Sequence, residues 1–198
     1  MILYGRGLSR SFRCVWALLE ADVPFEYVYV DRANLPDNYQ ALNSQIKVPT
    51  LVDGDLVSTE SAAIVNYAAA LSKLPLMPTA PKSRAAYDDL CYFVMTELEQ
   101  PLWSIGKHQF AIPEEYRIEA MLKTARWEFE KAQTALLKRF DGSGYVLNNE
   151  FSMADVLLGQ TLNWAIRFEM DVDQGLRDYR GRMFDRPACV AALKMVEV

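Results

Sequence analysis

The stretch KVPTLVDGDLVSTES, residues 47–61, contains two short runs of apolar and β-branched residues on either side of Asp53-Gly54. An Asp-Gly pair between two such runs is typical of a tight antiparallel hairpin, so we expect strands at residues 50–52 and 56–58. Apolar residues at helical spacing follow, and they predict a helix over residues 61–71. The sequence therefore predicts a hairpin at the edge of a sheet, followed directly by a helix.

The residues before this hairpin alternate between strand and helix patterns. Residues 1–4 and 25–30 are expected to form strands, and apolar residues recur at helical spacing until Asp22-Val23-Pro24, where proline ends the helix. Residues 36–42 form a short second helix in this prediction. The resulting order β-α-β-α-β-β-α predicts an α/β domain of thioredoxin-like type, with a mixed four-stranded sheet covered by helices.

Three prolines fall within residues 74–81, and a stretch of this kind cannot continue a helix or the interior of a sheet. We therefore expect a thioredoxin-like domain at residues 1–73, a linker at 74–81 and an all-helical domain at 82–198. Helices are predicted in this second domain over residues 82–108, 113–140, 152–168 and 187–196.

One of these helices has a complete start sequence. Ser152 is placed to cap the helix, and Asp155 lies three residues later, where its carboxylate reaches back to the Ser152 amide. Phe151 and Val156 flank this pair as a hydrophobic staple.

The composition narrows the classes of function. Half of the 198 residues are apolar, which suits a soluble globular protein, and a net charge of −5 argues against a surface for nucleic acid. We find no run of about 20 apolar residues and no signal core, so we expect neither membrane insertion nor export. Three scattered cysteines and one histidine, without metal-ligand spacing, predict no metal site and a reducing, cytoplasmic location.

Four segments of the chain together resemble the cytosolic glutathione S-transferase superfamily, and more closely its serine-type, theta-like and bacterial members. They are residues 8–13 (LSRSFR), 47–51 (KVPTL), 60–61 (ES) and 151–155 (FSMAD). The resemblance implies a glutathione transferase that activates the glutathione thiolate for attack on a small hydrophobic electrophile, a reaction used in detoxification. Alternatives are a glutathione-dependent isomerase or peroxidase, or a non-catalytic binding or regulatory protein of the same fold.

The same resemblance implies how glutathione is held. The bond before Pro49 is expected to be cis, so that Val48 offers its amide and carbonyl to the cysteinyl unit of the ligand. Ser61 and Glu60, at a helix start, would bind the γ-glutamyl carboxylate and ammonium group, and Lys47 would face the glycyl carboxylate. Three plainer interpretations stay open: a trans proline before an edge strand, a Ser61 that only caps its helix, and a solvated Lys47.

Thiolate stabilisation requires a donor near the sulfur, because a free cysteine thiol has a pKa of about 8.5. Ser9 is the first candidate from its spacing to Arg13 in the resemblance, and Ser11 is the second. Tyr4 is a weaker alternative that belongs to the end of a strand. Cys14 lies inside the helix and is interpreted as a packing residue.

The second substrate is expected to contact the loop before the first helix and the long helix after the linker. Candidate lining residues are Leu8, Tyr92, Met95, Trp103 and His108. Each can equally be a core residue, and a single histidine on a helix is more often structural. The resemblance also implies a homodimer. Residues 43–46 depart from the family pattern, and this departure affects the glycyl end of the proposed site most.

Overall fold

The computed structural model describes residues 1–197, which form two compact units. The first unit contains Met1–Pro78 together with residues 184–197, and the second contains Thr79–Met183. This division follows spatial contacts, and the domain limits drawn from the sequence stay a prediction.

The first unit is built on a four-stranded mixed sheet. Its strands are β1 (Ile2–Gly5), β2 (Glu26–Tyr29), β3 (Thr50–Asp53) and β4 (Leu56–Ser58), in the spatial order β2-β1-β3-β4. The pair β1 and β2 is parallel, whereas β1 with β3 and β3 with β4 are antiparallel. Gly54 takes a φ of 60° between β3 and β4, a conformation that glycine adopts without strain. The predicted hairpin and the thioredoxin-like sheet are confirmed.

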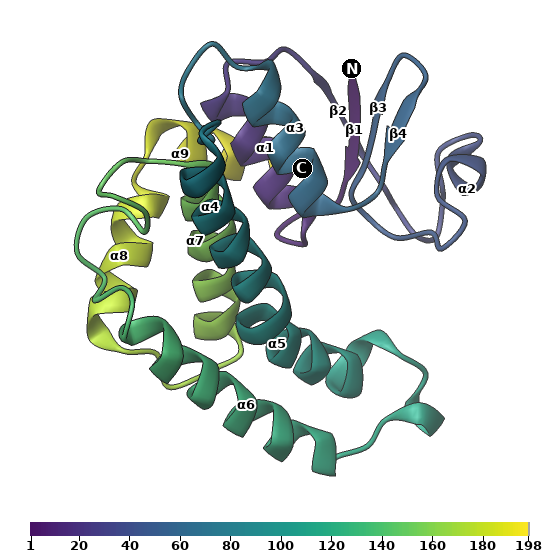
Figure 1. Ribbon diagram of the computed structural model, residues 1–198. Coiled ribbons are helices and arrows are strands. Elements are labelled where there is room, and N and C mark those ends of the chain that lie inside the picture. The colour runs from purple at the N-terminus through teal and green to yellow at the C-terminus, as the bar shows by residue number, and fades with distance from the viewer. Residues whose placement is uncertain (198) are drawn as a thin grey trace. The chain divides into compact units, whose positions relative to one another are not determined.

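The helices of this unit are α1 (Ser11–Glu20), α2 (Tyr39–Leu42), α3 (Ser61–Leu71) and α9 (Pro187–Val196). Figure 1 shows α1 and α3 side by side next to the strands, with α2 well apart from them. Helix α1 contacts β1, α3 and α9, and its residues 11–18 are all buried. A helix that is buried on all sides needs several neighbours, and α1 has them.

The C-terminal segment completes the core of the first unit. The guanidinium of Arg186 donates two hydrogen bonds to the Glu20 carboxylate, at 2.6 and 2.8 Å. The Phe184 ring lies 5.8 Å from the Phe12 ring and 5.7 Å from the Trp16 ring, measured between centroids. Residues far apart in the chain therefore share one core around α1.

The second unit is helical, as predicted. It contains α4 (Pro81–Phe93), a π-helical stretch Val94–Leu98, α5 (Glu99–Gly106), a second π-helical stretch Lys107–Ala111, a 3₁₀ turn Glu114–Tyr116, α6 (Ala120–Leu137), α7 (Met153–Arg167) and α8 (Gln174–Phe184), whose last residue belongs to the first unit. Helix α5 contacts α6, and α4 contacts α7 (Figure 1). Within residues 1–197, no helix is long and apolar enough to cross a membrane.

Two helix predictions in this unit need correction. Helix α8 is missing from the sequence prediction, because its two glycines and many charged residues weaken the apolar pattern of a helix. In the structure Leu176, Tyr179 and Met183 are nevertheless buried at helical spacing. Helix α6 begins at Ala120 and not at residue 113, because the chain first makes the 3₁₀ turn and an extended residue at Arg117.

The predicted capping box at the start of α7 is confirmed. The Ser152 amide donates to the Asp155 carboxylate at 2.9 Å, and the same carboxylate accepts the Val146 amide at 2.9 Å and the Tyr179 hydroxyl at 2.8 Å. Asp155 is fully buried, and this burial raises its pKa, while the hydrogen bonds act in the opposite direction. The carboxylate therefore joins α7 and α8 as well as capping a helix.

Candidate functional site

Three segments of the first unit meet near the end of β1. Tyr4 pairs with Thr50, the residue directly after Pro49. The Cys14 sulfur, in α1, lies 3.7 Å from the carbonyl oxygens of both Arg10 and Ser61. The loop after β1, the segment before β3 and the start of α3 are therefore close together, as the sequence interpretation required.

The loop after β1 is held by its two serines. The Arg6 amide donates to Ser11 Oγ at 3.0 Å, and the Ser11 amide donates to Ser9 Oγ at 3.2 Å. The two hydroxyl oxygens lie 2.6 Å apart, which is a short hydrogen bond between hydroxyl groups. Ser9 is half-buried, whereas Ser11 is fully buried.

Close packing explains why Ser11 is inaccessible. A Cβ atom at Gly5 would lie only 2.7 Å from both Ser11 Cβ and Tyr27 Cε2, a separation that real side chains do not tolerate. The end of β1 is thus pressed against the first residue of α1. Of the two candidate thiol donors, Ser9 is the one with an exposed part of its side chain.

The peptide bond between Val48 and Pro49 is cis, as predicted, so the alternative with a trans proline is wrong. The Lys47 carbonyl accepts hydrogen bonds from the Tyr39 hydroxyl at 2.5 Å and from the Asn43 side-chain amide at 2.9 Å. Within residues 1–197, neither main-chain group of Val48 has a hydrogen-bond partner. An extended peptide could therefore pair with Val48 as an added strand does.

Tyr39 and Asn43 are positioning residues that the sequence interpretation missed. The Tyr39 hydroxyl lies 3.0 Å from Thr50 Oγ1, and the Asn43 side-chain amide donates to the same oxygen at 3.1 Å. The Tyr39 ring is fully buried against Tyr4, with ring centroids 5.3 Å apart. A tyrosine and an asparagine four residues apart in a short helical segment were the available sign.

Ile46 has an unusual backbone conformation next to this segment. Its φ is 51°, which is a rare outlier for a β-branched residue. The Ile46 amide donates to the Asn43 carbonyl at 2.9 Å, and the fixed Lys47 carbonyl follows immediately. The hydrogen bonds that fix the Lys47 carbonyl therefore hold the neighbouring Ile46 in a left-handed conformation that it does not favour.

Ser61 is the first residue of α3, and Glu60 is its N-cap residue. Ser61 is only 2% exposed, and its hydroxyl oxygen has no hydrogen-bond partner among residues 1–197. Because this hydroxyl bonds to no main-chain amide, the alternative in which Ser61 only caps the helix is wrong. A buried hydroxyl beside the free amides of a helix start can donate to an anion. Glu60 and Lys47 are both exposed.

Cys14 lies below this region and is fully buried. Burial raises the pKa of its thiol well above the usual range, which keeps it protonated and unreactive. This agrees with the interpretation of Cys14 as a packing residue.

The predicted second-substrate residues are spread over both units. Leu8 belongs to the first unit, and the four others belong to α4, α5 and the π-helical stretches. Tyr92 is 66% exposed, Met95 and Trp103 are half-buried, and His108 Nδ1 accepts the Ile118 amide at 3.2 Å. Their common role stays a prediction.

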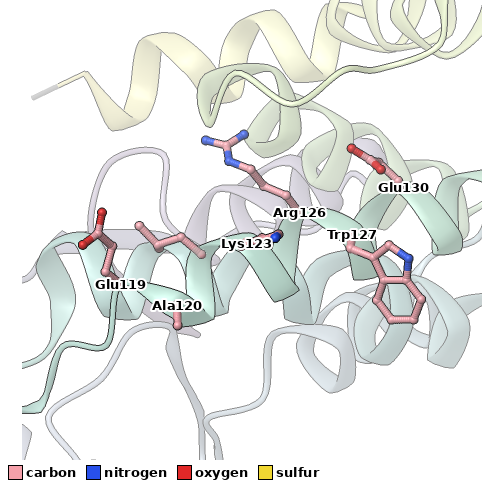
Figure 2. Close-up of a pocket in the computed structure, with 7 residues that line it drawn as sticks. Glu119, Ala120, Lys123, Arg126, Trp127 and Glu130 are labelled. Carbon is pink, nitrogen blue, oxygen red and sulfur yellow. The ribbon is translucent and has the colours of Figure 1, made fainter.

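Two hollows lie in the second unit. One, of about 660 Å³, is lined by Glu119 and by residues of α6, including Arg126 and Trp127 (Figure 2). Its lining residues come from a single helix and the residue before it, so no groups from different elements converge there. The other is lined mostly by polar residues, which come from α6, from residues 171–173 and from the start of α8. Among residues 1–197, no group of three His, Cys, Asp or Glu side chains could hold a metal ion.

Both halves of the chain match family models of the same family. The family model for the glutathione S-transferase N-terminal domain matches residues 3–75, and that for the C-terminal domain matches residues 100–187. The chain is 31% identical to a glutathione S-transferase of Triticum aestivum, over 86% of this chain and 81% of the relative.

Two further matches are a curated relative with a different name and a solved structure. A stringent starvation protein A homolog of Haemophilus ducreyi is 27% identical, over 85% of this chain and 78% of the relative. A solved structure of a sphingomonad glutathione S-transferase complexed with glutathione superposes with a TM-score of 0.84, at 26% identity and full coverage of both chains.

Proposed function

Because the chain belongs to the glutathione S-transferase family, we propose that it binds reduced glutathione and uses the thiolate to attack a small hydrophobic electrophile. In this proposal residues 1–73 bind glutathione and the helical residues 82–198 provide most of the second-substrate pocket. The observation that carries the proposal is the buried, unpaired hydroxyl of Ser61 at the start of α3.

Glutathione has complementary groups for each part of the site. Its γ-glutamyl carboxylate accepts the Ser61 hydroxyl and the first amides of α3, and the nearby Glu60 side chain takes the ammonium group. Its cysteinyl main chain pairs with Val48, and its glycyl carboxylate approaches the mobile charge of Lys47. The extended peptide thus runs along the edge next to Pro49.

The proposed chemistry requires a thiolate at neutral pH. The Ser9 hydroxyl donates to the sulfur, and the N-terminal end of α1 adds a positive field. Each unit by which the thiol pKa falls corresponds to about 1.4 kcal/mol, so one hydrogen bond and a helix dipole together account for about one to two units. The thiolate then forms the new bond to the electrophilic carbon, and the leaving group departs with the electron pair.

A binding protein without catalysis is the second candidate, and we keep it because a relative named stringent starvation protein A homolog does not carry the name of a transferase. The two candidates differ at Ser9, since binding alone does not need a thiolate donor. We also include a homodimer and a cytosolic location in the proposal, the latter supported by three buried cysteines that form no disulfide.

Calorimetric titration with reduced glutathione, combined with conjugation of a chloronitrobenzene, tests both candidates. We expect wild type to bind and conjugate, and Ser9→Ala to bind with little change while conjugation at neutral pH falls about 10-fold or more, as expected for about one unit in the thiol pKa. Glutathione binding with no conjugation of any electrophile tried would favour the binding protein. Absence of glutathione binding would refute the proposal.

A further inference from the structure

The hydroxyl proton of Ser11 has one acceptor within reach. Ser11 is fully buried, and its oxygen already accepts the Arg6 amide at 3.0 Å. Within the part of the chain that the structure describes, residues 1–197, the only acceptor that this hydroxyl contacts is Ser9 Oγ, at 2.6 Å. Since buried donors without an acceptor are rare and destabilising, the proton lies between the two oxygens and belongs to Ser11.

This assignment determines what Ser9 can do. Ser9 Oγ then accepts two hydrogen bonds, from the Ser11 hydroxyl at 2.6 Å and the Ser11 amide at 3.2 Å. A serine oxygen has two lone pairs and one proton, so both acceptor positions are used. The proton of Ser9 cannot point back to Ser11 and has to be donated away from it.

We propose that Ser11 is a positioning residue, which fixes Ser9 as the hydrogen-bond donor to the glutathione thiolate. This inference rests on the proposed function. The Ser11 hydroxyl is already engaged by the Arg6 amide and by Ser9 Oγ, so it acts through Ser9. Hydrogen bonds in a chain polarise one another, and the chain from the Arg6 amide through Ser11 to Ser9 strengthens the last donor.

The inference predicts a particular kinetic effect of Ser11→Ala. Ala keeps the Cβ that packs at the end of β1 but removes the proton that Ser9 accepts. We expect conjugation at saturating glutathione and neutral pH to fall about 3- to 10-fold, which equals a rise of about half to one unit in the pKa of the bound thiol. The KM for glutathione stays within about twofold, and the difference disappears at alkaline pH, where the thiol ionises without help.

The experiment compares Ser9→Ala, Ser11→Ala and the double variant in the full-length protein. The readouts are the pH profile of chloronitrobenzene conjugation and the ultraviolet absorbance of the bound thiolate. Because Ser11 acts through Ser9, the double variant is expected to match Ser9→Ala alone, not to show the product of the two effects. Tyr67→Phe is the matched control, since it removes a hydroxyl that donates to Asp53 at 2.8 Å in the same unit but outside the loop.

Two results would overturn the inference: an unchanged pH profile in Ser11→Ala, or independent effects that multiply in the double variant. If Ser11→Ala does not fold, Ser11→Cys keeps a donor at this position but a weaker one, and it is expected to shift the profile in the same direction. If Ser9→Ala shifts the profile but neither Ser11 variant does, only this inference fails. If Ser9→Ala shifts nothing while the protein still conjugates glutathione, the role of Ser9 fails and this inference fails with it, whereas the proposed function fails only if glutathione does not bind.

Discussion

Ser61→Ala should change binding and stability in opposite directions. A buried hydroxyl without a partner destabilises a fold by about 1–3 kcal/mol, so removing the Ser61 hydroxyl should leave the ligand-free protein equally stable or more stable by up to about 1 kcal/mol. A hydrogen bond to a carboxylate contributes about 1.5–3 kcal/mol, so the same change should weaken glutathione binding about 10- to 150-fold. A residue that served the fold alone would show the reverse.

The measurement pairs thermal unfolding without ligand with calorimetric titration of reduced glutathione. Ser72→Ala is a matched control on the other end of α3, because its hydroxyl accepts the Leu74 amide at 3.1 Å. The control is expected to lose a little stability and to keep its affinity. The reasoning is refuted if Ser61→Ala unfolds at a lower temperature than wild type and binds glutathione equally well.

Two further predictions concern stability. Ile46→Gly should be more stable than Ile46→Ala by up to about 1 kcal/mol in urea unfolding. The reason is that a φ of 51° costs alanine about 1–2 kcal/mol and costs glycine nothing. The usual order, in which the alanine variant is the more stable, would contradict backbone strain at Ile46. Asp155→Ala should lower the free energy of unfolding by about 3 kcal/mol, since four donors, three of them buried, lose their acceptor. The exposed Asp141, which accepts two hydrogen bonds from Ser143, is the control, and a loss in Asp141→Ala equal to that in Asp155→Ala would disprove the role of burial.

Local sequence patterns predicted those parts of the molecule that local chemistry determines. The Asp53-Gly54 turn and the Ser152 cap each depend on residues only a few positions apart, and each is found as expected. Helix α8 depends on a core assembled from distant segments, because the buried Tyr179 donates a hydrogen bond to Asp155, 24 residues earlier. No short window of sequence contains both residues. The same limit explains why Tyr39 and Asn43 were missed, since their importance arises from the Lys47 carbonyl that they share.

The candidate site also contains the residues that fit their own surroundings worst. Ile46 takes a backbone conformation that its side chain disfavours, and Ser61 buries a hydroxyl without a partner. Natural sequences are locally consistent, and exceptions concentrate where function requires them. Ile46 lies two residues before Val48, and the Ser61 carbonyl lies 3.7 Å from the Cys14 sulfur, as does the Arg10 carbonyl. Both exceptions therefore lie beside the segments proposed to bind glutathione. A ligand that accepts a hydrogen bond from the Ser61 hydroxyl removes one of these two energetic costs when it binds. Glutathione should therefore stabilise the wild-type protein more than it stabilises Ser61→Ala.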